Sequence, residues 1–485
     1  MTRDDGKKTT PWAFIHRAGA AFLLLLVALL PPPVRAEVFN PETFTLDNGM
    51  QVVVVTNRTA PVVSHMVWYK VGAADEPWGK SGIAHFVEHL MFRGTETVPD
   101  GEFSQRISRE GGQDNAFTSW DFTAYYQNVA SDRLRLVMEL EADRMVNLAL
   151  SDAVVLPERD VILEERAQRV DNVPGSRLNE QMYAALFQNH PYGIPIIGWS
   201  HEIAELTLED VESFYQTWYA PNNAILVVSG DINAETLRPL AEATYGQIPS
   251  RPVPERVRPM EPGAEGERRV VVTDPTVQQP LWRRLYLAPS YANDPDGHAY
   301  ALQVLSEVLG GGPTSRLYRS LVIDQGLAVS AGTGYSPNDL DYSVFVAVLA
   351  PTPGTDLEDA EAAFEEEVAR IVREGVPEAE VEAAKTRLAI AADYARDSLF
   401  GPARTLGAAL ATGQTIEDVE SWPDRIRAVT AEEVRAAAEA VLTAERAVTG
   451  LLLPEAPPSP VAAAPPPGAP AEEAPDAEEA LNDDK

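Results

Sequence analysis

Two long segments with a similar order of strand-like and helix-like stretches, separated by a run rich in proline and arginine, most limit the folds open to this chain. The run at 249–259 alternates proline with arginine and valine and continues into glycines at 263–266. Proline and glycine favour turns and extended connections. We therefore predict a first domain at 37–250, a linker at 251–267 and a second domain at 268–453.

The strand-like and helix-like stretches predict the fold class. β-branched and aromatic runs indicate strands, and apolar residues recurring every three or four positions indicate helices. Because the two types do not alternate strictly, we predict an α+β arrangement with two homologous halves. The expected strands are 50–56, 62–71, 125–129, 224–229, 268–273, 342–349 and 447–453, and the expected helices are 81–92, 131–148, 297–309, 356–374 and 378–398.

Composition excludes several classes of function. The 485 residues carry a formal net charge of -34, which argues against nucleic acid as a partner because phosphates require clusters of lysine and arginine. The chain has no cysteine, which excludes thiolate catalysis and cysteine-ligated metals. A cysteine-free domain also requires a core that is stable without disulfides.

The N-terminus predicts export. Basic residues precede an apolar run at 18–30, and Val34 and Ala36 suit the -3 and -1 positions of a signal-peptidase site. We predict a signal peptide at 1–36, with an uncleaved anchor as the alternative. The apolar run is shorter than a membrane span, and no second such run follows, so we expect no stable membrane span after cleavage. A bacterial periplasm fits export without cysteine.

The C-terminal segment at 454–485 is rich in proline, alanine, glutamate and aspartate and contains no aromatic residue. Such a composition buries too little apolar surface to offset the entropy of ordering. We therefore predict a disordered acidic tail.

A predicted helix carries His85, Glu88 and His89 at positions i, i+3 and i+4, so the three side chains share one face. Two imidazoles one turn apart can reach a single Zn²⁺ at about 2.0 Å, and a carboxylate between them can take a proton from water activated by the metal. The reversed order is the H-E-x-x-H motif of other zinc peptidases. Because the chain has seven histidines in all, two at this spacing would rarely occur by chance and favour a metal site. The alternative is that both are structural histidines, which would give the same pattern.

A third protein ligand is needed to leave one zinc position open. Pro157 suits the first turn of a second helix, on which Glu158 and Glu165 lie seven residues apart, two turns along one face. One glutamate could bind zinc while the other supports the site. The alternative is that this Glu- and Arg-rich helix is a solvated surface.

Several longer stretches resemble one family. The residues at 85–95, 111–126, 158–165, 190–198 and 219–231 resemble the pitrilysin-type zinc peptidases, or inverzincins, and within them the processing peptidase β subunit of mitochondria and its bacterial relatives. The resemblance extends from about Phe44 to Leu452. It implies two α+β halves, each a mainly antiparallel sheet with helices packed on it, facing each other across a cavity that admits extended or unfolded peptides.

The resemblance also implies roles for individual residues. His85, His89 and Glu165 match the ligands of one zinc ion per chain, and Glu88 matches the general base. Glu158 matches an acidic residue that supports the site.

Asn115 and Ala116 match the edge strand that pairs with the backbone of a peptide substrate. For Asn115 the alternative is a bulge or turn residue after two glycines.

The chain departs from the family pattern in its second half. Relatives carry an arginine and a tyrosine seven residues apart that bind the substrate carbonyl, whereas Val322 and Val329 stand at these positions here. Arg316 and Tyr318 lie nearby, but their spacing differs. We therefore expect a related chain to supply the Arg/Tyr pair, so that this chain is the metal-bearing subunit of a heterodimer.

These features predict a zinc-dependent endopeptidase acting on peptides or unfolded polypeptides. Two alternatives remain open. The chain could be a non-catalytic peptide-binding or structural subunit of a related complex, or an enzyme that processes one exported precursor or a small peptide-derived cofactor.

Overall fold

The computed structural model describes residues 38–264 and 266–455. The predicted signal peptide at 1–36 lies outside these ranges. So does the predicted tail, except for Pro454 and Glu455, of which Pro454 is the last residue of a strand. Among the residues described, we find no helix whose length and apolarity would let it cross a membrane.

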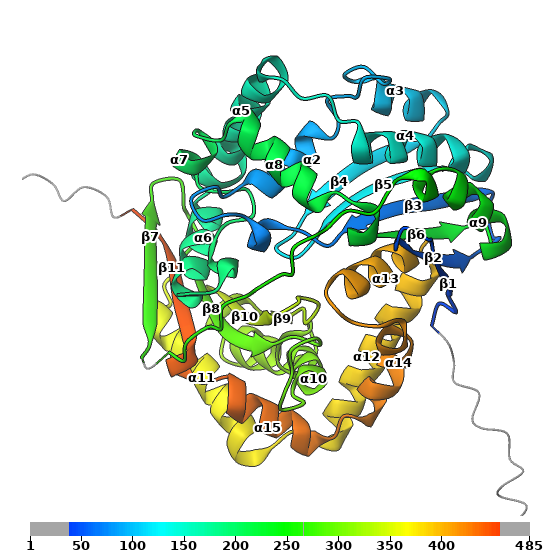
Figure 1. Ribbon diagram of the computed structural model, residues 1–485. Coiled ribbons are helices and arrows are strands. Elements are labelled where there is room, and N and C mark those ends of the chain that lie inside the picture. Colours follow the sequence, from blue (N-terminus) through cyan, green and yellow to red (C-terminus); the bar gives the residue numbers. More distant parts are fainter. Residues whose placement is uncertain (1–37, 265, 456–485) are drawn as a thin grey trace, which may run out of the picture.

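The first half is built on a six-stranded sheet (Figure 1). Its strands β2 and β6 are parallel, and its other neighbouring strands are antiparallel. In spatial order the strands are β1 (Glu42–Thr45), β2 (Gln51–Thr56), β6 (Ala224–Gly230), β3 (Val62–Tyr69), β5 (Thr123–Ala130) and β4 (Gln113–Thr118).

The second half repeats this sheet with five strands. Again one neighbouring pair, β7 and β11, is parallel, and the others are antiparallel. When β1 is set aside, both sheets place their strands in the chain order first, fifth, second, fourth, third. This shared topology confirms the prediction of two homologous α+β halves. The strands in spatial order are β7 (Arg268–Asp274), β11 (Ala447–Pro454), β8 (Leu281–Pro289), β10 (Tyr342–Pro351) and β9 (Ala328–Tyr335).

The helices also correspond between the halves. We number the five strands that the two sheets share in chain order, with β1 set aside. Each half then has one long connection between its second and third strands and five α-helices between its fourth and fifth strands. In the first half the helices are α2 (Ile83–Leu90), α3 (Glu102–Arg109), α4 (Leu134–Val146), α5 (Asp152–Arg166), α6 (Pro174–Leu186), α7 (Ser200–Ile203), α8 (Leu208–Trp218) and α9 (Ala234–Ala243). In the second half they are α10 (Ala299–Gly310), α11 (Leu357–Glu374), α12 (Glu378–Asp397), α13 (Gly401–Ala411), α14 (Ile416–Ala428) and α15 (Ala431–Val441).

Both faces of the first sheet are buried, which explains the uninterrupted valines of β2. Val52 and Val54 pack into the core with α2 and α4, whereas Val53 and Val55 pack on the opposite face against α13 of the second half. Strands buried on both faces have continuous apolar sequences instead of alternating ones.

Each half places one helix on the sheet of the other half. Helix α13 packs on β3 and β6, and its counterpart α6 packs on β7 and β11 (Figure 1). Both contacts depend on a glycine, because a Cβ at Gly407 would lie 2.1 Å from Trp68 Nε1 and one at Gly450 would lie 2.2 Å from Met182 Sδ. This reciprocal packing joins the halves through apolar contacts.

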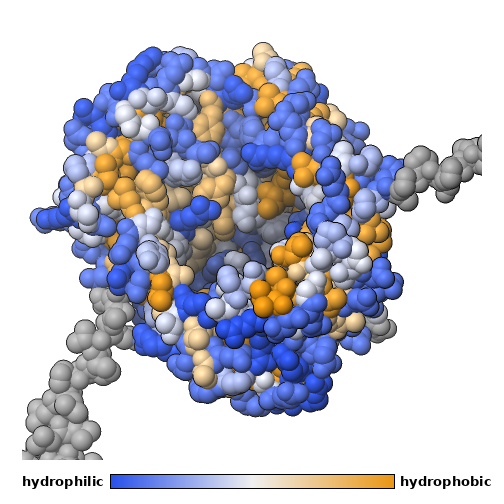
Figure 2. All heavy atoms as spheres, turned by 180° about the vertical axis from the view of Figure 1, so that it is seen from behind, coloured by the Kyte–Doolittle hydropathy of each residue, from blue (hydrophilic) through white to orange (hydrophobic). Residues whose placement is uncertain are grey.

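The connection between the halves contains no helix or strand from 249 to 264. It is nevertheless held in place by charge. Arg258 pairs with Asp75 and Asp121 of the first half and with Asp341 of the second, at 2.7, 3.3 and 3.4 Å. Figure 2 shows the surface hollowed at the centre of one face, with hydrophobic residues on the rim.

The structure corrects one local prediction. Helix α5 begins at Asp152, so Pro157 lies inside the helix and not in its first turn. Ser151 is the extended residue before the helix, and its carbonyl accepts from Val154 and Val155, while Asp152 suits the positive end of the helix dipole. Proline at 157 removes one donor without ending the helix.

Candidate metal centre

Helix α2 positions the histidine motif. The carboxylate of Glu76 accepts the backbone N–H groups of Gly82 and Ala84 at 3.0 and 2.8 Å, which satisfies free donors at the start of the helix. His85 and Glu88 are buried, and His89 is half-buried. The start of α2 is thus fixed directly before His85.

Helix α5 packs against α2 and brings in the third candidate ligand. Glu165 Oε2 lies 3.2 Å from His89 Nε2 and 3.7 Å from His85 Nε2. The three side chains form a group whose candidate ligand atoms all lie within 4.8 Å of one another. Tetrahedral zinc with bonds of about 2.0–2.1 Å would hold its ligand atoms about 3.3 Å apart.

Two atoms of this group make no hydrogen bond within the described ranges. Glu165 Oε2 and His85 Nδ1 are buried without a hydrogen bond to any of the described residues. A buried carboxylate oxygen without a donor is costly. A cation between Glu165 and the two imidazoles would compensate it, so the residues present fit zinc.

Burial and the neighbouring charges favour neutral imidazole at one candidate ligand, His85. Burial, followed by the charges of His89 and Arg169, lowers the pKa of His85 to about 3. His85 therefore remains neutral near neutral pH, which is the form that binds metals. Arg169 also pairs with the other oxygen of Glu165 at 2.7 Å, which orients that carboxylate.

Glu158 lies two turns before Glu165 on α5 and supports His89. Its Oε1 accepts from His89 Nδ1 at 2.9 Å, and its Oε2 contacts Arg93. Burial raises the pKa of Glu158, but the His89 hydrogen bond and the Arg93 charge outweigh burial and hold it below its ordinary value. With its Nδ1 directed at Glu158, His89 turns Nε2 toward Glu165.

Glu88 is held beside the group by the end of β4. Its Oε2 accepts from the hydroxyl of Thr118, the last residue of that strand, at 2.5 Å. Burial raises the pKa of Glu88, although the Thr118 bond opposes this. A carboxylate with a raised pKa can both take and return a proton near neutral pH.

Strand β4 lies at the edge of the first sheet and runs toward Glu88. Asn115 and Ala116 pair with Tyr126 and Tyr125 of β5 in an unbroken register from 113 to 118, so Asn115 is not a bulge or turn residue. The other side of β4 has no strand partner among the described residues. A peptide could therefore extend the sheet at β4.

Three residues that contact this group were not assigned a role from the sequence. Thr118 and Arg93 lie within stretches that carry the family resemblance, but nothing local indicated their contacts. Arg169 follows Glu165 by four residues, a spacing that favours an ion pair on a helix.

The corresponding helices of the second half carry no such group. Helix α10 contains no histidine, and its Glu307 pairs with Arg387 of α12 at 3.0 Å. Val322 packs on the core of this half, and Val329, on the edge strand β9, is 51% exposed. Arg316 pairs with Glu380 at 2.7 Å, which occupies its Nε donor.

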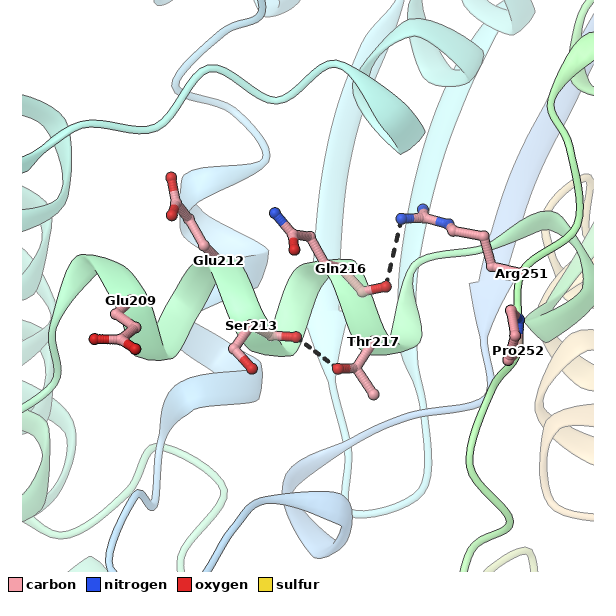
Figure 3. Close-up of a pocket in the computed structure, with 7 residues that line it drawn as sticks. All are labelled: Glu209, Glu212, Ser213, Gln216, Thr217, Arg251 and Pro252. Carbon is pink, nitrogen blue, oxygen red and sulfur yellow. Dashed lines mark hydrogen bonds between the residues drawn. The ribbon is translucent and has the colours of Figure 1, made fainter.

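A cavity of about 490 Å³ lies along α8 (Figure 3), apart from the histidines. Two of its polar side chains are engaged locally. Thr217 Oγ1 donates to the Ser213 carbonyl at 2.7 Å, and Arg251 donates to the Gln216 carbonyl at 3.4 Å. None of its lining residues belongs to the group around Glu165.

The sequence matches two descriptions of one peptidase family. "Insulinase (Peptidase family M16)" matches residues 51–199, and "Peptidase M16 inactive domain" matches residues 205–388. The chain belongs to peptidase family M16. The M16 inactive-domain match starts before β6, so the boundary between the two matches differs from the boundary between the two sheets.

Members of M16 with similar sequences are named proteases. The chain is 34% identical to "Zinc protease PqqE" of Helicobacter pylori over 342 residues, which is 69% of this chain and 76% of that protein. An uncharacterized zinc protease of Mycobacterium tuberculosis is 32% identical over 422 residues, 85% of this chain and 93% of that protein.

Solved structures share the M16 fold. A protease from Helicobacter pylori superposes with a TM-score of 0.79 at 29% identity, covering 86% of this chain and 100% of that chain. The first half of the periplasmic protease PqqL of Escherichia coli gives 0.72 at 21% identity, covering 86% and 92%. The second likeness concerns the fold alone.

Proposed function

We propose that this chain is a zinc-dependent endopeptidase that hydrolyses peptides or unfolded polypeptides, and that it is the metal-bearing subunit of a heterodimer in the bacterial periplasm. The convergence of His85, His89 and Glu165 beside Glu88 carries the proposal. Zinc protease names among M16 relatives support it.

In this proposal the side chains of α2 and α5 have separate roles. His85, His89 and Glu165 hold one Zn²⁺, and Glu158 fixes the ring of His89. A bound Zn²⁺ would supply Lewis acidity to water and to the peptide carbonyl. Glu88 takes the proton from the attacking water and returns it to the leaving amine, while Thr118 holds the carboxylate in place.

The peptide would lie along β4 as an added strand. Backbone hydrogen bonds at Asn115 and Ala116 would orient the scissile bond toward Glu88 without selecting side chains. This mode of binding requires an extended peptide, which supports unfolded polypeptides as the proposed substrates.

The need for a partner follows from the second half. Val322 and Val329 offer no donor for the oxyanion, and each such donor contributes on the order of 3 kcal/mol to the transition state. A related chain with the Arg/Tyr pair would complete the site. The export signal predicted at 1–36 supports a location outside the cytoplasm for this chain, and a partner chain would have to be exported too.

The alternative is a non-catalytic peptide-binding or structural subunit. The same two valines, and the match of residues 205–388 to the inactive-domain description, favour it. It differs from the peptidase in one outcome, because such a subunit would bind peptides without cleaving them.

Zinc analysis and a quenched-peptide library test the proposal. We expect one zinc per chain, weak cleavage by the chain alone and strong cleavage with a related chain bearing the Arg/Tyr pair. Glu88→Gln should keep the zinc and lose about 10³-fold in kcat, the contribution of a general base. Bound zinc without cleavage in any pairing would favour the binding role, and full activity of the lone chain would remove the partner requirement.

A further inference from the structure

A second cavity, of about 580 Å³, is lined by residues that follow two segments of the candidate metal centre in the chain. Trp120, in its wall, follows Thr118, the residue that holds Glu88. Val170, in another wall, lies on the π-helix Ala167–Asp171 that continues α5 directly after Glu165. The cavity is therefore bordered by the same two segments that position the group around Glu165.

The walls of this cavity are largely apolar, although Ser176, Asn179, Glu180 and Arg283 also line it. The rings of Trp120 and Tyr183 stack with centroids 5.3 Å apart and an interplanar angle of 22°. Trp120 Nε1 also donates to the Ile194 carbonyl at 3.0 Å, which fixes the loop from 193 to 197. Ile194, Ile196 and Ile197 are half-buried although they border the cavity. Such a surface fits a large apolar side chain.

One cationic side chain reaches the cavity from the other half. Arg283 lies on β8 and donates to Asn179 Oδ1 at 2.8 Å across the junction. Its Nε is buried without a hydrogen-bond partner, and no carboxylate of the described residues lies within ion-pairing distance of it. Burial lowers the pKa of Arg283, and the neighbouring Tyr183 opposes this only in part.

The nearest acidic wall residue does not neutralise this guanidinium. Glu180 is held in a two-pronged pair by Arg166, at 2.8 and 2.9 Å. A half-buried cation without a counter-charge is costly, and a carboxylate brought by a ligand would offset that cost. The cavity thus combines apolar walls with one unpaired positive charge.

We propose that this cavity is a substrate subsite that binds a bulky apolar side chain of the peptide and that Arg283 pairs with a carboxylate adjoining it. The inference rests on the proposed peptidase function, because it takes the ligand to be the peptide that lies along β4. It names the substrate class as peptides in which a large apolar residue precedes a carboxylate. That carboxylate belongs either to an acidic side chain or to the C-terminus.

Binding to the zinc-loaded Glu88→Gln chain tests the subsite separately from cleavage. Fluorescein-labelled peptides with Phe-Glu, Phe-Gln and Ala-Glu, each with a free and an amidated C-terminus, are compared by fluorescence polarisation. We expect a carboxylate to tighten Kd about tenfold over its amide, the value of one charge-assisted pair. Whether the Glu/Gln pair or the free/amidated pair shows the difference identifies the source of the carboxylate. Replacing Phe by Ala should weaken binding about tenfold.

Substitutions assign the effect to one side chain. In Arg283→Met the Kd of the amide peptide divided by the Kd of the acid peptide should fall to near one. In Arg283→Lys this ratio of Kd values should be retained in part. Arg319→Met, an exposed arginine of the same half, should keep the full ratio. A thermal melt confirms that each variant is folded.

The outcomes separate the two proposals. Equal Kd values for acid and amide, or no measurable binding of any peptide, would overturn the subsite. If the native chain cleaves nothing in any pairing while the carboxylate preference persists, the peptidase proposal fails and the subsite stands.

Discussion

Helices α2 and α5 of the first half and helices α10 and α12 of the second occupy the same places in two copies of one topology. In the first pair, two imidazoles and a carboxylate converge and leave Glu165 Oε2 without a hydrogen-bond partner. In the second pair, Glu307 meets Arg387, so the charges compensate each other. The same backbone arrangement thus holds, in one half, a group that we propose binds a cation and, in the other half, an ion pair whose charges compensate each other.

The largest difference between the two halves should appear when one histidine is removed from each half. His85→Ala should reduce zinc from one per chain to near zero and lower peptidase activity by about 10³-fold, since the metal contributes several kcal/mol to the transition state. His298→Ala, directly before α10, is the matched variant and should keep both. Metal analysis and peptide cleavage measure the two effects, and retention of zinc by the first variant would contradict the proposed ligands.

A second prediction gives the second half the hydrogen-bond donors that it lacks at positions 322 and 329. Val322→Arg combined with Val329→Tyr should raise the kcat of the lone chain by about 10²-fold, which corresponds to roughly one good oxyanion donor. The control is Val322→Met with Val329→Phe, which adds similar bulk without donors. An unchanged kcat in the first double variant would show that these positions do not reach the substrate.

A smaller effect should come from the residue behind His89. Glu158→Gln removes the charge that orients the imidazole and should weaken zinc affinity by about 10- to 100-fold. In the other half, Glu307→Gln alters an ion pair with arginine and should leave zinc affinity unchanged. A chelator competition measures the zinc affinity of both variants. An affinity of Glu158→Gln equal to that of the unsubstituted chain would show that Glu158 does not support zinc binding.

The smallest effect concerns the junction of the halves. Burial, and then the charge of Asp121, raise the pKa of Asp339 to about 7 from 3.8. The folded state therefore holds a proton that the unfolded state loses above pH 4, so this group makes stability fall as pH rises from 4 to 7.

Asp339→Asn should remove that dependence and narrow the difference in Tm between pH 5.5 and pH 8 by about 2 to 4 °C. The exposed Asp296→Asn should not change it. Thermal unfolding at the two pH values measures the difference. A steeper loss of stability in Asp339→Asn would contradict the raised pKa.

The sequence by itself located part of the elements and the candidate ligands, whereas strands β1, β4, β8 and β9 and about half of the helices were not among the elements expected from periodicity. Periodicity located the expected strands and helices to within a few residues, because burial of one or both faces dictates which positions are apolar. The spacing of His85, Glu88 and His89 placed them on one helical face, since 3.6 residues make a turn. Helix α5 was predicted too, although its start was misplaced because Pro157 tolerates an interior position.

Only the tertiary structure decided which distant groups meet. The exchange of α6 and α13 between the sheets, the bond from Thr118 to Glu88 and the contact of Arg93 with Glu158 join residues far apart in the chain. No local pattern encodes such contacts, because they depend on the packing of whole elements. The same holds for Arg283, whose lack of a counter-charge becomes visible only when the two halves are brought together.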